Sequence, residues 1–349
     1  MNDLEFMVVA FNAAAKVNPH KTKSNPRVGC AVALGGKIIS TGAHEVFGEA
    51  HAEVNALKNL IPGCNLESIN NDDFHPGMEV SKATIYITLE PCVKTSLKKT
   101  PACTDLLLKF KPARVVIGLL DPHFPGQGVA QLKAAGIKVE VLNTKHHQIL
   151  NPWFETWITT QKPFMTLKVA QSLDGKITPA LTDYQQGKRT LTGLTTQQLV
   201  HTLRATNQAL LTSTETILED DPQLDARHAE NLDFLASAPD LIVIGKREIP
   251  KTAKIFKAKN RSVHFVKDLK DLVPFCRENQ IASVMTECGG SLNTQLIEQR
   301  LIDQIELFTA PIICGDTAKP GFTKELDLSL FHLKNVCHLE NDLWQTSCK

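Results

Sequence analysis

The chain has 349 residues, enough for two hydrophobic cores, and its 38 basic and 37 acidic side chains give a formal net charge of +1. This balance excludes a general electrostatic attraction to nucleic acid or to an anionic membrane surface. Hydrophobic residues make up 42% of the sequence, as in ordinary globular proteins, and no apolar run approaches the roughly 18 residues that a membrane helix needs.

Residues 1–145 alternate between helical and strand patterns. Residues 3–17 carry apolar side chains at helical spacing, and Gly35-Gly36 suits a tight turn between two strands. The predicted helices cover 3–17, 49–60, 103–110 and 126–136, and the predicted strands cover 28–34, 37–41, 83–89, 114–119 and 137–142. This alternation predicts a three-layer α/β domain over 1–145, with a polar surface excursion at 61–82.

Residues 146–349 predict a second domain. Residues 145–160, with Trp153 and Trp157 four apart, predict a helix that bridges to this domain, and a new strand opens at Phe164. Further strands are expected near 207–213, 240–245, 281–286 and 302–310, and helices near 195–205, 266–278 and 290–299. The pattern predicts a second α/β domain that is doubly wound.

The most informative motif is His51-Ala52-Glu53, followed by Glu90-Pro91-Cys92 and then by Cys103. One histidine and two cysteines form a three-ligand zinc set that leaves the fourth tetrahedral position to water. H-x-E followed by P-C-x-x-C marks the zinc-dependent base deaminases, although ten residues separate the two cysteines here. The alternative is that both cysteines are buried apolar thiols and that His51 lies on a helix surface.

The residue types predict hydrolytic deamination. Zinc lowers the pKa of its water toward roughly 7, so that the water attacks a ring carbon. Glu53 is not a ligand in this hypothesis and acts as the acid and base that moves the protons. For Glu90, hydrogen bonding to backbone donors is the stronger interpretation, and His44 is equally compatible with a structural and a substrate-binding role.

The nine cysteines lack the dense, regular spacing of a secreted disulfide scaffold. The first residues, Met1 to Glu5, are acidic and lack the basic patch and apolar core of a signal peptide. We therefore expect a cytoplasmic protein whose reduced thiols are available to a metal.

Two sets of motifs occur in the same order along the chain. The first set is NPRVG at 25–29, HAEV at 51–54, TLEPC at 88–92 and TPAC at 100–103. The second set occupies 167–176, 203–205, 211–213, 216–224 with Arg227, 287–292 and 310–311. Together they resemble the bifunctional deaminase/reductase family of riboflavin biosynthesis, the RibD family, over nearly the whole chain.

The resemblance implies a cytidine-deaminase-like zinc domain followed by a dihydrofolate-reductase-like α/β domain. The first would deaminate a diamino-hydroxypyrimidine that carries a phosphoribosylamino group, held by Asn25, and the second would reduce the ribosyl group to ribityl with NADPH. The residues that it places at NADPH are Gln171, Thr216, Asp220, Gly289, Gly290 and Ser291. Those that it places at the phosphoribosyl substrate are Arg204, Leu224, Arg227 and Glu287.

Physical reasoning supports part of this assignment. Gly289-Gly290, between a strand and a helix, lets backbone amides approach a phosphate, although such a pair is equally often only a tight turn. Arg204 and Arg227 could clamp a phosphate, whereas a lone arginine is usually a solvated charge. For Lys168 and Asp174, the sequence is equally compatible with a structural ion-pair role and with a functional role.

The sequence departs from the family in two loops. Residues 93–99 replace a histidine-containing loop, and we expect Lys94, Lys98 or Lys99 to contact the substrate phosphate unless the loop is merely a solvated basic segment. Residues 182–192 lack the Ser-x-Trp expected near the nicotinamide, with Lys188 and Thr190 close to those places.

Three functions fit the sequence to different degrees. The leading hypothesis is a bifunctional enzyme, and the alternative is an active deaminase with a degenerate, structural reductase half. A deaminase of nucleic-acid bases would need a basic stripe with stacking aromatics, but aromatic residues make up only 6% of the chain and the net charge is near zero. The expected partners are the small-molecule substrate and further copies of the chain, as a dimer or tetramer, with no nucleic acid and no membrane.

Overall fold

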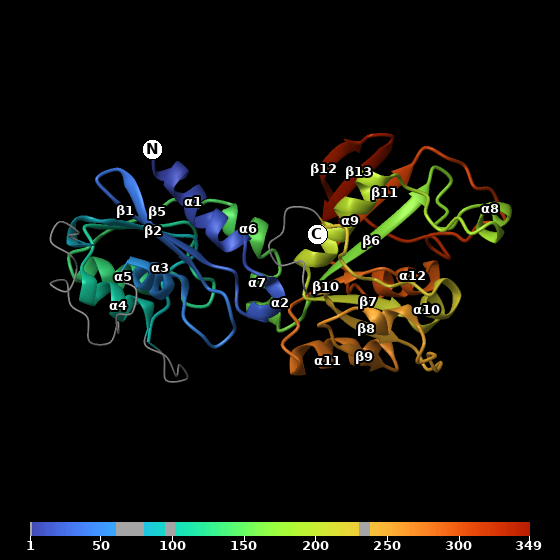
Figure 1. The fold of residues 1–349 in the computed structure, drawn as a ribbon, viewed down its shortest axis with the longest axis horizontal. Coiled ribbons are helices and arrows are strands. Elements are labelled where there is room, and N and C mark those ends of the chain that lie inside the picture. The colour runs from blue at the N-terminus through green and yellow to red at the C-terminus, as the bar shows by residue number, and fades with distance from the viewer. Residues whose placement is uncertain (1, 61–79, 95–101, 230–237) are drawn as a thin grey trace. The chain divides into compact units, whose positions relative to one another are not determined.

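A computed structural model of the chain describes residues 2–60, 80–94, 102–229 and 238–349. The chain divides into two compact units, Met1–Thr160 and Gln161–Lys349. Each unit combines helices with a single sheet among its described residues (Figure 1). The α/β class predicted for both halves of the sequence is therefore confirmed.

Unit 1 is built on a mixed sheet. Its strands are β1 (Gly29–Leu34), β2 (Lys37–Ala43), β3 (Thr84–Ile87), β4 (Arg114–Ile117) and β5 (Lys138–Val141). Over the described residues their order is β2-β1-β3-β4-β5, with β1 antiparallel to both of its neighbours and β3, β4 and β5 parallel. The predicted strands are present, several of them shorter at one or both ends.

Helices cover both faces of this sheet. They are α1 (Asp3–Ala15), α2 (Pro19–Thr22), α3 (Ala52–Leu60), α4 (Cys103–Phe110), α5 (Gln127–Ala134), α6 (His146–Leu150) and α7 (Phe154–Thr160), with a short 3-10 helix, η2, at Val80–Lys82. α1 and α6 lie on one face, and α3, α4 and α5 lie on the other (Figure 1).

The sequence produces these three layers because successive strand residues point to opposite faces. On one face of β1, Val32 packs in a core with residues of α3, α4 and α5, among them Leu57, Leu107 and Leu132. On the opposite face, Ala31 packs in a separate core with Phe6 and Met7 of α1. The three-layer arrangement predicted from the sequence is thus confirmed.

Gly42 brings α3 close to the sheet. A Cβ atom at this position of β2 would lie 2.2 Å from the backbone nitrogen of Ala56, so only glycine permits the observed approach. The Asn55 amide donates a 2.7 Å hydrogen bond to the Ala43 carbonyl. These contacts fix the first turn of α3, and with it the residues of the His-x-Glu motif.

The segment predicted as one helix over 145–160 is two short helices, α6 and α7. Pro152 lies between them, where it cannot continue a helix that would need its N–H. Asn151 ties the break to unit 1, because its side chain accepts the Arg27 N–H at 2.8 Å and donates to the Arg27 carbonyl at 2.9 Å. The compact unit accordingly ends at Thr160, whereas the sequence pattern predicted the boundary after residue 145.

His147 makes unit 1 sensitive to acid. Burial, with the nearby Arg27 charge, lowers the pKa of His147 to about 4. The unfolded chain takes up a proton near pH 6.5 and the folded chain does not until about pH 4, so stability present at pH 7 is lost as the pH falls through this window. We expect a loss of about 2 kcal/mol in the free energy of unfolding between pH 7 and pH 5 from this residue.

Urea unfolding of the wild type and of His147→Gln at both pH values measures this effect. The variant should lose about 2 kcal/mol less than the wild type on acidification. His338→Gln, at an exposed histidine of unit 2, is the matched control and should behave as the wild type. An equal loss in the wild type and in His147→Gln would assign the acid sensitivity to other groups.

Unit 2 is built on a larger mixed sheet. Its strands are β6 (Phe164–Ser172), β7 (Ala209–Ser213), β8 (Asp240–Ile244), β9 (Val263–Val266), β10 (Ser283–Thr286), β11 (Gln304–Ala310), β12 (His332–Leu339) and β13 (Asp342–Cys348). Among the described residues they follow the order β12-β13-β11-β6-β10-β7-β8-β9. The six strands from β11 to β9 run parallel, and β12 and β13 form an antiparallel hairpin at one edge.

Two cores lie on the two faces of this sheet. The helices are α8 (Leu181–Gln185), α9 (Leu194–Thr206), α10 (Thr214–Asp220), α11 (Leu272–Glu278) and α12 (Gly290–Glu298), with 3-10 helices η3 (Lys254–Lys257) and η4 (Leu269–Asp271). Leu211 faces a core that includes α11 and α12, whereas its neighbour Leu210 faces a core that includes α9 and α10. The parallel strands are therefore covered on both sides, as parallel sheets require.

The C-terminal hairpin and β9 were not predicted from the sequence. Most side chains of β12 are exposed, so this strand has no apolar alternation that a pattern could detect. β9 ends at Val266, where the predicted helix range 266–278 begins, and α11 covers only the second part of that range. None of the helices in the described ranges is both long and apolar enough to cross a membrane.

Candidate active sites

His51, Cys92 and Cys103 meet in unit 1. His51 Nδ1 lies 3.5 Å from Cys92 Sγ and 3.3 Å from Cys103 Sγ. All three potential ligand atoms lie within 4.8 Å of one another. The structure therefore brings together the three residues that the sequence predicts as metal ligands, although His51 lies more than 40 residues before either cysteine.

Three element ends position this cluster. His51 immediately precedes α3 rather than lying in its first turn as predicted, Cys92 follows β3, and Cys103 is the first residue of α4. The Cys103 N–H donates to Cys92 Sγ at 3.3 Å, and the Thr104 N–H donates to the Cys92 carbonyl at 3.2 Å. Backbone donors at the start of a helix favour a thiolate, the form of cysteine that binds metal.

The cluster fits zinc. With typical Zn–N and Zn–S bonds, tetrahedral coordination separates a nitrogen ligand from a sulfur ligand by about 3.6 Å. The two N–S distances observed, 3.5 and 3.3 Å, lie close to that value. One imidazole and two thiols are also a donor set that zinc prefers, and three protein ligands leave one position for water or substrate.

Glu53 lies beside the three ligands. It occupies the first turn of α3 and is only 3% exposed. Burial, followed by the nearby Cys92 charge, raises the pKa of the Glu53 carboxyl above its ordinary value. A buried carboxyl with a raised pKa, next to a metal site, is suited to take up and release a proton during a reaction.

Asn25 and His44 extend the site on the side of His51. The His44 and His51 rings lie 5.2 Å apart, and Asn25 Nδ2 is 3.1 Å from His44 Nε2. His44 Nδ1 is 3.1 Å from the Ala50 carbonyl, so the hydrogen-bond network assigns the proton to Nδ1 and leaves Nε2 to accept from Asn25. His44 thereby fixes the orientation of the Asn25 amide.

Glu90 serves the backbone. Its carboxylate accepts hydrogen bonds from the N–H groups of Asp121, Gly126 and Val129, at 3.1, 2.9 and 3.0 Å. This is the structural role that the sequence favoured for the residue. Lys98 and Lys99, predicted as phosphate contacts, lie outside the described residues, and Lys94 is exposed.

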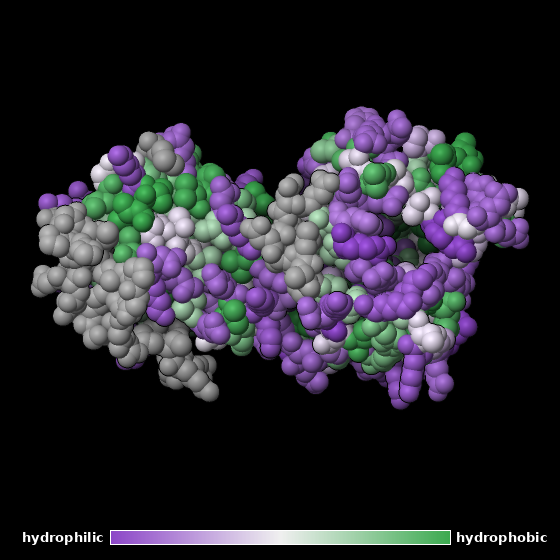
Figure 2. All heavy atoms as spheres, in the orientation of Figure 1, coloured by the Kyte–Doolittle hydropathy of each residue, from purple (hydrophilic) through white to green (hydrophobic). Residues whose placement is uncertain are grey.

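Unit 2 contains a cavity of about 620 Å³. It is lined by the middle of β6, by residues 287–289 that follow β10, and by residues of α9, α10 and the segment 189–192. Figure 2 shows a hollow in this unit that is rimmed by hydrophilic side chains. A crevice at the carboxyl ends of parallel strands is the usual ligand site of such sheets, and the volume suits a small molecule.

The structure gathers most of the residues expected at the reductase ligands. The predicted residues that line the cavity are Arg204, Thr216, Asp220, Leu224, Arg227, Glu287 and Gly289. Those outside its lining are Gln171, Gly290 and Ser291. Gly290 begins α12, and a Cβ atom there would lie 2.3 Å from the Pro320 carbonyl oxygen, so this glycine lets two backbone segments meet.

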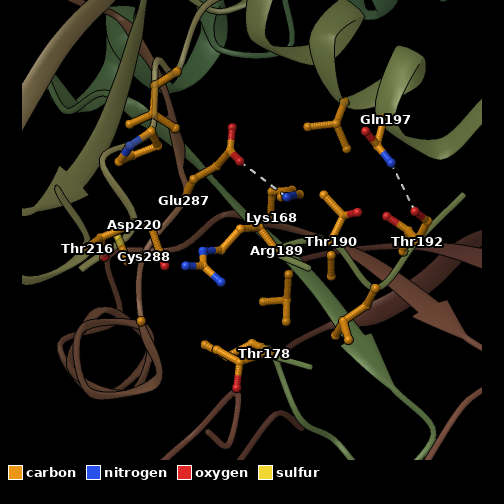
Figure 3. A pocket seen from close by; sticks show the side chains of 18 of the residues that line it. Lys168, Thr178, Arg189, Thr190, Thr192, Gln197, Thr216, Asp220, Glu287 and Cys288 are labelled. Atoms are coloured by element: carbon orange, nitrogen blue, oxygen red, sulfur yellow. Dashed lines mark hydrogen bonds and ion pairs between the residues drawn. The ribbon is translucent and has the colours of Figure 1, made fainter. Parts of the chain in front are cut away.

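A buried ion triad forms part of the cavity wall. Glu287 accepts from Arg204 Nε at 2.5 Å and from Arg204 Nη2 at 2.9 Å. It also accepts from Lys168 Nζ at 3.2 Å (Figure 3). Burial alone would raise the pKa of the Glu287 carboxyl, but the charges of Arg204 and Lys168 outweigh it and hold the pKa well below its usual range. Asp174, considered together with Lys168 in the sequence, instead accepts the N–H groups of Cys314 and Gly315.

Sequence reasoning missed two further residues of the cavity, His201 and Arg189. His201 lies three residues before Arg204 on α9, a spacing that could have signalled a shared face. Asn293 of α12 lies in the turn at 289–295 that the resemblance places at NADPH; it is 1% exposed, and its Oδ1 accepts no hydrogen bond from the described residues. Arg189 stands in a polar loop without periodicity, so no pattern marked it.

The folds and the two sites define the class of the protein: a zinc-dependent deaminase unit followed by an α/β unit with a nucleotide-sized cavity. Comparison with known families agrees in both halves. The cytidine and deoxycytidylate deaminase zinc-binding region matches residues 1–119, and the RibD C-terminal domain matches residues 163–344.

Known proteins match the chain over nearly its whole length. The riboflavin biosynthesis protein RibD of Aquifex aeolicus is 34% identical over 91% of this chain and 90% of its own. The crystal structure of a deaminase/reductase from Thermotoga maritima superimposes with a TM-score of 0.81 at 27% identity, covering 99% of this chain and 98% of the other. RibD of Acinetobacter baumannii gives a TM-score of 0.80 at 28% identity with the same coverage.

The chain belongs to the RibD family. It is a bifunctional deaminase and reductase of riboflavin biosynthesis, a hydrolase joined to an oxidoreductase, with zinc and NADPH as cofactors. The match of the C-terminal domain to the second half does not favour the alternative of a degenerate, structural reductase half.

Proposed function

We propose that unit 1 deaminates a diamino-hydroxypyrimidine bearing a phosphoribosylamino group and that unit 2 then reduces the ribosyl group of the product. The observation that carries this proposal is the convergence of His51, Cys92 and Cys103 around a buried Glu53. The Thermotoga maritima relative, a diaminohydroxyphosphoribosylaminopyrimidine deaminase and phosphoribosylaminouracil reductase, combines the same pair of activities and supports the proposal.

His51, Cys92 and Cys103 hold zinc in this mechanism, and Glu53 moves the protons. When bound, zinc acts as a Lewis acid that activates a water molecule for attack on the ring carbon bearing the amine. Glu53 takes one proton from the attacking water and gives it to the ring nitrogen, and it then carries the second water proton to the amine, which leaves as ammonia. Burial of Glu53 keeps bulk water from competing for these protons.

Asn25 orients the pyrimidine. His44 accepts one of its amide hydrogens, which leaves the Asn25 carbonyl oxygen to accept from an amino group or ring N–H of the substrate. Lys98 and Lys99 remain proposed contacts for the substrate phosphate. Together with Lys94, they are the basic residues of the segment between the two cysteine ligands, and an ammonium group is a suitable partner for a phosphate.

In unit 2 the protein supplies placement, since the hydride comes from the cofactor. Thr216, Asp220, Gly289, Gly290, Ser291 and Gln171 are proposed to hold NADPH, with its phosphates near the first turn of α12, where N–H groups lack helical partners. Leu224, Arg227 and Glu287 are proposed to hold the phosphoribosyl substrate. Arg227 is half exposed and bonds Asp225 at 2.5 Å, so it can reach a ligand in the cavity.

Arg204 is proposed as a substrate contact chiefly through Glu287. Its Nε and Nη2 both donate to that carboxylate, and its Nη1 donates to the Asp225 carbonyl at 3.0 Å. With these donors engaged, Arg204 orients the Glu287 carboxylate in the cavity, and the charged triad forms a fixed surface for the ribosyl hydroxyls.

Zinc content tests the ligand assignment directly. Cys92→Ala and Cys103→Ala should each reduce co-purified zinc to background and abolish deaminase turnover, because two remaining ligands hold the metal weakly. Reductase turnover with the deaminated substrate should persist. Metal analysis of each purified variant measures its zinc content. Cys337→Ala in unit 2 is the matched control and should keep its zinc. Full zinc content in both ligand variants would contradict the assignment.

We further propose a cytoplasmic homo-oligomer, either a dimer or a tetramer. A zinc site with two thiolates needs reduced cysteines, which supports a reducing compartment. Edge strand β12 leaves Leu333 and Val336 57% and 47% exposed, which supports a contact with another copy. Sedimentation of the purified protein decides the state of association, and a monomer at all concentrations would exclude the oligomer.

A further inference from the structure

The charges around the unit 2 cavity are unequal. Six cationic side chains and four carboxylates line it, an excess that suits an anionic ligand. Five of the six cations already have carboxylate partners within the protein. These pairs are Lys168 and Arg204 with Glu287, Arg227 with Asp225, Lys254 with Asp221, and Lys319 with Glu219.

Arg189 is the remaining cation. Within the described ranges its guanidinium pairs with no carboxylate, and its side chain projects into the cavity (Figure 3). Arg189 is exposed and has no described counter-charge, so its guanidinium attracts an anionic ligand that enters the cavity. Arg189 is thus the cavity cation whose charge no described acidic residue neutralises.

The protein holds this guanidinium in a fixed orientation. Its centre lies 3.8 Å from the Tyr184 ring centroid, and Nη1 donates to the Tyr184 carbonyl at 2.5 Å. Tyr184 is itself held, since its hydroxyl donates to Asp220 Oδ1 at 2.5 Å. The Nε and Nη2 atoms of Arg189 donate no hydrogen bond to any described residue, so both donors stay available to a ligand.

We propose that Arg189 recognises a phosphate monoester bound in this cavity and so determines specificity in the reductase half. The proposal rests on the proposed function of unit 2. A planar guanidinium with two free donors matches the oxygens of a phosphate in bidentate geometry. Both ligands of the reduction carry such a group: the phosphoribosyl substrate at its ribose, and NADPH on its adenosine ribose.

The neighbouring Lys188 provides a natural comparison. It carries the same charge one residue earlier, but it pairs with Asp183 at 3.2 Å and is not part of the cavity lining. If positive charge in this loop mattered only for holding the loop, Lys188 and Arg189 would be equivalent. The geometry instead gives the cavity-facing role to Arg189 alone.

Calorimetric titration of the full-length, zinc-loaded protein tests the proposal without requiring turnover. Wild type, Arg189→Gln, Arg189→Lys and Lys188→Gln are each titrated with two pairs of ligands. One pair is NADPH and NADH, and the other is the deaminated phosphoribosylamino substrate and its dephosphorylated form. Within each pair, the two ligands differ by one phosphate monoester.

Arg189→Gln should weaken binding of the phosphorylated member of one pair about 10- to 100-fold and leave the other member within about twofold. A change confined to NADPH identifies the cofactor phosphate, and a change confined to the substrate identifies the ribose phosphate. Arg189→Lys should recover part of the loss, and Lys188→Gln should match the wild type. Equal weakening of both members of a pair, or no change in either pair, would overturn the proposal.

Failure of the proposed reductase function would look different. In that case the wild type would oxidise no NADPH in the presence of the deaminated substrate, whatever Arg189 does to binding. The two outcomes are read from separate measurements, so each can be contradicted independently of the other.

Discussion

Glu53→Gln should lower the deaminase kcat by about 100- to 10,000-fold while zinc remains bound. The substitution keeps the shape of the side chain and leaves His51, Cys92 and Cys103 in place, but the amide cannot carry a proton between the water and the amine. Burial raises the pKa of the wild-type Glu53 carboxyl, which favours a carboxyl that can hold a proton between its removal from water and its delivery to the amine.

Two internal controls separate a chemical effect from a folding defect. Zinc content and reductase turnover of Glu53→Gln should equal those of the wild type. Glu45→Gln, at an exposed carboxylate eight residues earlier, should retain full deaminase activity. If Glu53→Gln kept wild-type turnover with zinc bound, another group would have to move the protons and the assigned role of Glu53 would be wrong.

Glu287→Gln should destabilise unit 2 by about 3–5 kcal/mol and lower the reductase rate about 100-fold. The Lys168 and Arg204 side chains are 15% and 13% exposed, and both charges pair with this carboxylate. Removing its charge leaves two buried cations facing a neutral amide, which is costlier than any single hydrogen bond that the amide restores.

Urea unfolding followed by far-ultraviolet circular dichroism measures the loss of stability, and NADPH oxidation with the deaminated substrate measures the loss of activity. Glu278→Gln, at an exposed carboxylate of α11, should change the free energy of unfolding by less than about 0.5 kcal/mol. A Glu287→Gln protein as stable as this control would mean that the triad contributes little to the fold.

The zinc cluster was accessible to sequence reasoning because its signal is chemical and local. The spacing of His51 and Glu53 is two residues, and α4 begins at Cys103 as predicted from the preceding Pro101. The start of α3 was placed a few residues too early, since Glu49 suits a first helical turn as well as Glu53 does. That error moved His51 into the helix without changing its role as an expected ligand.

The cavity of unit 2 was less accessible because its charges interact over long sequence separations. Lys168 and Glu287 are 119 residues apart, and Arg204 and Glu287 are 83 apart. No local pattern records such pairings, so Arg204 was expected to bind phosphate directly, whereas its donors reach Glu287 and the Asp225 carbonyl. Arg189 could not be singled out for the same reason, since its importance depends on which other cavity cations pair with carboxylates.

The helix and strand predictions were wrong where tertiary packing, and not hydrophobic periodicity in the sequence, determines the secondary structure. The exposed strand β12 has no apolar alternation, and its partner β13 is held against β11 along its length. In the same way, residues 145–160 were predicted as one helix although Pro152 divides them. The alternating apolar strands under α3, α4 and α12 were predicted well because their burial is recorded in the sequence itself.

The order of the two reactions can be followed directly in the mass of the substrate. The zinc-loaded protein is incubated with the phosphoribosylated diaminopyrimidine, first without and then with NADPH, and the products are identified by mass spectrometry. We predict exchange of an amine for oxygen without NADPH, and a gain of two hydrogens only after NADPH is added. Reduction before deamination, or deamination with no reduction at any NADPH concentration, would contradict the proposal that the two sites act in this order.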